Sequence, residues 1–172
     1  MNPVKNFIIK FLLAISLCCI TFTPAFSQQL KNKEAGKPWE FQVKTFEGKT
    51  AFLPHHKGRV AIYVFQAFWC DTWKEVSQGY KTLKNEMNEV PCDFSAVCID
   101  SVMPDETTVK KAMEESDYPI YTDYSGEISN YYKIKSVPTF MVFDKKNRLV
   151  FRHEGYPGNK MLKKLLIELN KP

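Results

Sequence analysis

A continuous apolar run that leads into a cysteine is the feature of this sequence that most constrains its fold. Residues 60–65 read Val-Ala-Ile-Tyr-Val-Phe, and Trp69-Cys70-Asp71-Thr72-Trp73 follows shortly after. An unbroken apolar run of this length is typical of a strand buried on both faces. The apolar residues that come next recur at helical spacing: Val76, Tyr80, Leu83 and Met87. This spacing predicts a helix over about 71–89, so Cys70 lies where a strand passes into a helix, a position that favours a thiolate.

The remaining patterns alternate between strand and helix. An alternating segment at 41–46 and a return at 50–52 predict a hairpin around Gly48. Further strands are predicted at 94–99, 138–143 and 149–153, and further helices at 105–115, 125–132 and 159–170. Alternation of this kind predicts an α/β fold with a mixed central sheet flanked by helices.

The first 27 residues have the pattern of a secretory signal peptide. Lys5 supplies the positive start, Phe11 to Ile20 is a short apolar stretch, and Ala25-Phe26-Ser27 has the small residues that a signal peptidase needs. The apolar stretch is short for a membrane span. We therefore expect cleavage after Ser27, an export to the periplasm or the medium, a polar leader at 28–37 and one domain at 38–172. A retained anchor, or a lipid on Cys18 or Cys19, is the alternative and the only expected link to a membrane.

Export changes what the five cysteines imply. Removal of the two in the predicted signal leaves Cys70, Cys92 and Cys98. An odd number in an oxidising compartment implies an unpaired thiol or an intermolecular bond. A covalent dimer through Cys70 is one form that such a bond can take.

Charge and histidine content exclude other classes of function. The formal net charge of +5 is small and scattered, which argues against a nucleic-acid partner. His55 and His56 are adjacent in a predicted loop, and side chains of neighbours in extended backbone diverge. We therefore expect neither a metal site nor a cofactor.

Four motifs together resemble the thioredoxin superfamily, in particular its exported TlpA/ResA-like branch. They are Phe68-Trp69-Cys70 after the buried strand, Ser136-Val137-Pro138-Thr139-Phe140, the segment 144–150 with Gly155, and the hairpin segment 41–58. The resemblance covers about residues 38–170. It implies a thioredoxin fold with an extra N-terminal β-hairpin, a cis bond at Val137–Pro138 near Cys70, and thiol–disulfide chemistry.

Three departures from the family pattern concern the reactive site. Trp73 stands where dithiol members of the family have their second cysteine. The family also places a buried acid near its thiol pair, and the two positions at which we expect it hold Val64 and Val76. The proline often found between the two cysteines of the family is also absent, and Asp71-Thr72 stands there. In addition, Ala67 stands where the related peroxiredoxins need a threonine, which argues against peroxidase chemistry.

The leading hypothesis is an exported thioredoxin-like thiol-disulfide oxidoreductase with Cys70 as its single nucleophile. Its partners would be a protein or peptide disulfide and an external thiol reductant. Trp69, Trp73, Val137 and Pro138 are the predicted substrate-binding residues. The alternative is a redox-inactive binding or scaffold protein that uses the groove around Trp69, Trp73 and Pro138. Trp73 could fill the space of the lost thiol or form an aromatic platform with Trp69, and Asp71 is the predicted cap of the following helix.

Overall fold

The computed structural model describes residues 38–102 and 104–172, and the predicted signal peptide and leader lie outside these residues. The strands are β1 (Gln42–Lys44), β2 (Thr50–Phe52), β3 (Val60–Gln66), β4 (Cys92–Cys98), β5 (Ile120–Thr122), β6 (Thr139–Phe143) and β7 (Leu149–Glu154). The helices are the 3-10 turn η2 (Pro38–Glu40), α2 (Trp73–Glu86), α3 (Glu106–Glu115), α4 (Glu127–Tyr131) and α5 (Asn159–Asn170).

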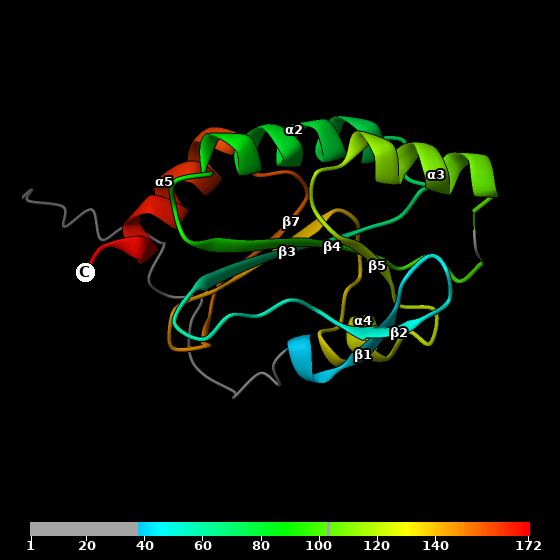
Figure 1. Ribbon diagram of the computed structural model, residues 1–172, viewed down its shortest axis with the longest axis horizontal. Helices are drawn as coiled ribbons and strands as arrows, with labels where there is room; N and C mark the ends of the chain where they lie inside the picture. The colour runs from blue at the N-terminus through cyan, green and yellow to red at the C-terminus, as the bar shows by residue number, and fades with distance from the viewer. Residues whose placement is uncertain (1–37, 103) are drawn as a thin grey trace, which may run out of the picture. The chain divides into compact units, whose positions relative to one another are not determined.

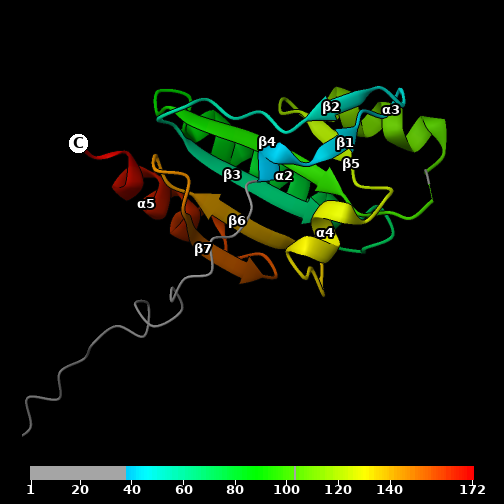
Figure 2. The same ribbon diagram turned by 90° about the horizontal axis from the view of Figure 1, so that it is seen from below.

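The strands form one seven-stranded mixed sheet in the order β2-β1-β5-β4-β3-β6-β7. β4 lies parallel to β3 and to β5, whereas β6 and β7 add antiparallel beside β3, and the β1–β2 hairpin adds antiparallel beside β5. Helices α2, α3 and α5 cover one face of this sheet, and α4 lies on the other (Figure 1). Figure 2 shows the succession of strands from below. The predicted fold class, a mixed sheet with an N-terminal hairpin, is confirmed.

The two central strands are buried throughout. Every residue of β3 and of β4 is buried, as expected for strands with covered faces on both sides. Alternate residues of β3 enter two different clusters: Ile62 packs with the face under α2, α3 and α5, while Tyr63 packs with α4 and the hairpin. The hydrophobic core is therefore two layers that share one sheet.

Helix α2 holds its place through an apolar stripe and one buried hydroxyl. Val76, Tyr80 and Leu83 are the buried residues of the helix, and their spacing of four and three places them on one side. The Tyr80 hydroxyl donates to the Ile62 carbonyl oxygen at 2.8 Å and accepts from the Ser95 amide at 3.2 Å. Burial raises the pKa of Tyr80 well above its usual value, so the group stays a hydrogen-bond donor. α2 is thus bonded to the backbones of both central strands.

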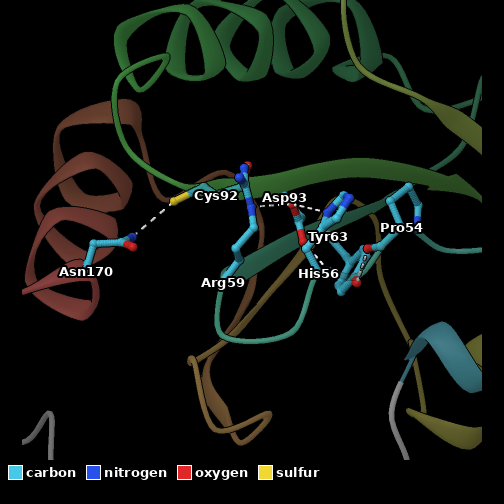
Figure 3. Close-up of polar contacts among 7 residues, drawn as sticks. All are labelled: Pro54, His56, Arg59, Tyr63, Cys92, Asp93 and Asn170. Carbon is cyan, nitrogen blue, oxygen red and sulfur yellow. Dashed lines mark hydrogen bonds and ion pairs between the residues drawn. The ribbon is translucent and has the colours of Figure 1, made fainter.

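A polar cluster holds the first residues of β4, at the end of the strand that lies away from Cys70. Figure 3 shows the residues of this cluster. The Asp93 carboxylate, 3% exposed, accepts from the His56 amide at 2.7 Å and lies 2.9 Å from both the His56 ring Nδ1 and Arg59 Nε. Next to it, Asn170 of α5 donates to the Cys92 sulfur at 3.2 Å. These contacts tie the loop before β3 and the end of α5 to the start of β4. His56, one of the two adjacent histidines, is therefore an exposed loop residue that is also a partner of a buried carboxylate.

A glycine allows the connection before α5 to cross α2 closely. A Cβ at Gly79 would lie 2.2 Å from the Tyr156 hydroxyl oxygen, so a larger residue here would force the Tyr156 side chain to move. Asn159 donates to the Gly79 carbonyl oxygen at 2.8 Å and accepts from the Tyr156 hydroxyl at 2.7 Å. The first residue of α5 is thereby joined to the middle of α2.

The sequence pattern misses one strand and misplaces one helix start. β5 spans three residues, too few for a periodic pattern, and it exists through its pairing with β4 and β1. Helix α2 begins at Trp73 rather than near residue 71, with Thr72 rather than Asp71 as its N-cap. Cys70 accordingly lies in the turn before the helix and not on its first turn.

We expect Tyr80→Phe to lower the free energy of unfolding by about 1–3 kcal/mol, because the Ile62 carbonyl and the Ser95 amide lose a partner where water does not reach. Urea unfolding followed by circular dichroism measures this change. Tyr121→Phe, at a half-buried tyrosine on β5, is the control and should cost less than about 0.5 kcal/mol. Equal values for the two variants would contradict the assigned role of the Tyr80 hydroxyl.

Candidate functional site

The Cys70 loop is a tight turn between β3 and α2. The Cys70 amide donates to the Ala67 carbonyl oxygen at 3.2 Å, and the Trp73 amide donates to the Cys70 carbonyl oxygen at 2.9 Å. The helical hydrogen bonds then start with the Val76 amide, which donates to the Thr72 carbonyl oxygen at 3.0 Å. These bonds hold the backbone on both sides of the cysteine, so the position of its sulfur is set by the turn.

The Cys70 sulfur is half-buried and has two polar neighbours. It lies 3.4 Å from the Thr72 hydroxyl oxygen and 3.7 Å from the Val137 carbonyl oxygen, to which the thiol donates. The Val137–Pro138 peptide bond that follows this carbonyl is cis. Residues that are 67 apart in the chain therefore meet at the thiol, as the resemblance implies.

Three of the four predicted substrate-binding residues gather around Cys70. Trp73, Val137 and Pro138 line a small hollow beside the sulfur, together with residues of the loop and of α2. Trp69 is not among the residues that line it, and its side chain is 68% exposed. The structure thus separates Trp69, on the outer side of the loop, from the three residues at the sulfur.

Trp73 is partly buried and packs against the core. Its ring lies 4.9 Å from the Phe68 ring in a tilted contact, and Phe68 in turn contacts Phe46 of the hairpin connection at 5.9 Å. Both Phe68 and Trp73 pack against the core cluster under α2. This packing supports the interpretation that Trp73 fills the space of a second thiol, rather than forming a platform with Trp69.

The other two described cysteines are buried and free. Cys92 and Cys98 stand at opposite ends of β4, and neither forms a disulfide. Burial raises the pKa of Cys92 to about 11, and burial raises the pKa of Cys98 further, with the Asp100 carboxylate acting in the same direction. Both thiols are therefore poor nucleophiles at neutral pH.

A buried carboxylate supports the loop, and the sequence reasoning missed it. The Asp100 side chain follows β4, is 5% exposed, and accepts from the Phe68 amide at 3.2 and 3.1 Å. Burial raises the pKa of Asp100, while the amides of Phe68 and Trp69 act against this rise. A signal for it was available, because the first polar residue after a buried strand parallel to β3 falls at the same sheet edge as Cys70.

Asp100 should make stability depend on pH in a defined direction. A carboxyl whose pKa is higher in the folded than in the unfolded protein binds its proton more tightly when folded, so its ionisation lowers stability as pH rises from the unfolded pKa through the folded pKa. Asp100→Asn does not titrate. We expect the variant to gain stability relative to the wild type as pH rises above the usual pKa of an aspartate, about 4, as measured by urea unfolding at several pH values.

Asp105→Asn is the matched control because its sign is opposite. Asp105 caps α3 by accepting from the Thr108 amide at 3.0 Å, and hydrogen bonds from Thr108 lower the pKa of its carboxyl. Stability from this group is present above the unfolded pKa and is lost as pH falls, so Asp105→Asn should lose stability relative to the wild type as pH rises. Parallel slopes for the two variants would show that burial does not dominate at Asp100.

The side chains at this edge are those of the Cys70 loop, β3, β4 and the Val137–Pro138 turn. Across 38–102 and 104–172, no three His, Cys, Asp or Glu side chains lie close enough together to hold a metal ion. The chemistry available at the site is that of a half-buried thiol, a hydroxyl and a backbone carbonyl.

Comparison with known proteins agrees with this geometry. The thiol-disulfide oxidoreductase ResA of Bacillus cereus is 24% identical over 143 residues, which cover 82% of this chain and 81% of the relative. The exposed lipoprotein thioredoxin of Streptococcus pneumoniae superimposes with a TM-score of 0.60 at 25% identity, over 74% of this chain and 98% of that one. A thiol-disulfide oxidoreductase of Bacteroides fragilis superimposes with a TM-score of 0.60 at 22% identity, over 77% and 99%.

The match to a defined family spans most of the domain. Residues 52–170 match the thioredoxin-like domain, a range that includes the Cys70 loop, the Val137–Pro138 turn and the closing hairpin with α5. The order β3, Cys70 loop, α2, β4 and later the cis-proline strand β6 is the arrangement that the sequence motifs imply. The chain belongs to the thioredoxin-like domain family.

Proposed function

We propose that this protein is a thiol-disulfide oxidoreductase that acts through the single thiol of Cys70. The observation that carries this proposal is the placement of the sulfur: it is half-buried, at the turn between β3 and α2, and against the Val137 carbonyl. Cys92 and Cys98 are buried elsewhere on β4. The names of relatives such as the Bacillus cereus and Bacteroides fragilis proteins support the same class of reaction.

The reaction available to one thiol is exchange with a disulfide. The Cys70 thiolate attacks one sulfur of a partner disulfide, a new bond forms between the two sulfurs, and the other partner sulfur leaves as a thiolate. Trp73 occupies the position from which a second cysteine would attack this mixed disulfide. An external thiolate must therefore attack the Cys70 sulfur, so that the partner leaves with both of its sulfurs reduced. A second external thiolate then releases Cys70 as a thiolate, and the two external thiols, now joined in a disulfide, have supplied the two electrons.

The partner would lie along the residues that surround the sulfur. Val137 and Pro138 line the hollow at Cys70 and Trp73 forms its inner wall. Trp69 presents an exposed aromatic face at the outer side of the same loop, where a peptide partner can cover it. We assign these four residues to substrate binding within this proposal. A second copy of the chain is also an acceptable partner and would give a disulfide-linked dimer.

We expect a disulfide-bonded peptide to form a mixed disulfide on Cys70 that a small-molecule thiol reverses. Iodoacetamide should modify Cys70 at least about ten-fold faster than Cys98, because Cys98 is buried and its thiol pKa is raised. Mass spectrometry of proteolytic peptides from the native protein identifies the modified residue in both experiments. Cys70→Ser is the negative control, and Cys98→Ser should retain the adduct. An adduct that persists in Cys70→Ser, or equal alkylation of the two thiols, would overturn the proposal.

The packing of Trp73 also favours a second candidate function. A tryptophan packed against the core at this position, in place of a second cysteine, leaves no internal dithiol turnover, and a fold that keeps its groove can bind a peptide without redox chemistry. The groove would then be the surface around Trp69, Trp73 and Pro138. Insulin reduction separates the two functions: an oxidoreductase with one thiol accelerates reduction when a small thiol is supplied, and a binding protein gives the rate of the small thiol alone.

We propose further that the protein is exported, to the periplasm or beyond the cell. The pattern of residues 1–27 supports this, and one similar protein is named as an exposed lipoprotein. In the part of the chain that the structure describes, none of the helices has the length and apolar character needed to cross a bilayer.

Material recovered after expression of the full chain in a bacterial host should begin at Gln28 and carry no lipid. The expected cleavage follows Ala25-Phe26-Ser27, whose small residues fit a signal peptidase. Intact-mass measurement of the periplasmic fraction reads out the N-terminus. Retention of residues 1–20, or an acyl group on Cys18 or Cys19, would contradict the cleavage site. An Ala25→Arg variant should remain uncleaved and provides the mass of the unprocessed chain.

A further inference from the structure

Thr72 is the N-cap residue of α2, but its side chain does not cap the helix. A threonine at this position normally has extended backbone angles and accepts a hydrogen bond from an amide of the first turn. Thr72 has φ −87° and ψ −1°, in the helical region, and its side chain makes no such bond. Its hydroxyl oxygen lies instead 3.4 Å from the Cys70 sulfur. The Thr72 hydroxyl therefore contacts the Cys70 thiol and not the helix amide that a capping threonine usually binds.

The two polar neighbours of the sulfur favour opposite protonation states. The Val137 carbonyl oxygen can only accept, so its contact with Cys70 at 3.7 Å exists for the thiol and is lost on ionisation. The Thr72 hydroxyl can accept from the thiol or rotate and donate to the thiolate. A charge-assisted bond from a hydroxyl is stronger than the same contact between neutral groups. When Cys70 loses its proton, its hydrogen bond to the Val137 carbonyl is therefore lost, and the Thr72 hydroxyl becomes a hydrogen-bond donor to the sulfur.

We propose that Thr72 is a catalytic residue whose hydroxyl donates a hydrogen bond to the Cys70 thiolate. A second thiol at position 73 could donate such a bond, but Trp73 stands there. This inference rests on the proposed function of Cys70. The same bond acts twice in the exchange cycle, because Cys70 is a thiolate when it attacks a disulfide and again when it leaves the mixed disulfide. Trp73 is packed against Phe68 and the core.

Charged residues also stand on the segments around the Cys70 loop. They are Asp71 beside Cys70 in the loop, Lys74 and Glu75 on the first turn of α2, Asp100 after β4, and Lys135 on the segment that leads to Val137. None of them changes in a substitution of Thr72. A comparison of Thr72→Val with the wild type therefore isolates the hydroxyl, because valine keeps the shape and removes the donor.

The test is the rate of Cys70 alkylation as a function of pH in the wild type, Thr72→Val and Thr72→Ser. Thr72 is exposed and makes no capping bond, so all three proteins should unfold at similar urea concentrations. At a pH below the midpoint of the profile, we expect Thr72→Val to react about 3- to 10-fold more slowly, with its midpoint displaced to higher pH, as the loss of one exposed charge-assisted bond predicts. Thr72→Ser, which keeps the hydroxyl, should stay within about two-fold of the wild type.

A midpoint in Thr72→Val equal to that of the wild type would overturn the inference. If Thr72→Val also lost stability in that case, the hydroxyl would be assigned to the helix end. The experiment does not depend on a disulfide partner, since iodoacetamide alone is the probe. If Cys70 shows the expected difference in midpoint but forms no reversible adduct with a disulfide peptide, the proposed function fails, and with it the catalytic role of Thr72, while its hydrogen bond to the thiolate stands.

Discussion

The parallel pairing of β3 with β4 is the constraint on which the rest of the structure depends. Seven consecutive pairs, from Val60 opposite Cys92 to Gln66 opposite Cys98, join two strands that are buried along their whole length. Strands covered on both faces read as nearly continuous apolar runs, and the thiol and the carboxylate of this edge stand just beyond their ends. Because the pairing is parallel, both carboxyl ends fall at one edge, and the two segments that follow are held side by side.

That edge places two polar groups under different demands. The Cys70 sulfur needs access to a partner, whereas Asp100 is buried and bonded to the Phe68 amide. The carboxylate holds the turn that carries the thiol, at the cost of a raised pKa for its own ionisation. A tie of the Ile99 amide to the Gln66 carbonyl oxygen, 2.9 Å long, continues the strand contact into the two loops. The loop therefore owes its shape to the neighbouring strand as much as to its own sequence.

The main elements could be predicted because their signals are local. The apolar run of β3, the helical spacing in α2 and the closing helix at 159–170 each lie within one segment, and the structure places α5 at the predicted bounds. β5 has three residues and depends on its pairing with β4 and β1, so no local sequence pattern predicts it. Asp100 was missed among the positions near Cys70 in the sequence, because it reaches the loop through the pairing of β3 with β4. The direction of the Thr72 hydroxyl depends on the turn, which no residue type specifies.

Because Cys92 and Cys98 are buried, Cys70 is the one accessible cysteine thiol in the described part of this chain. An oxidant that couples chains through accessible thiols stops at two chains, so oxidation cannot build a cross-linked network from this domain. The presence of one accessible thiol also affects what happens to Cys70 after oxidation by peroxide. A sulfenic acid on Cys70 would have no accessible thiol in its own domain with which to condense, since its two companions are buried in β4. Its fate is then set by the concentration of outside thiols, against the irreversible step to a sulfinic acid.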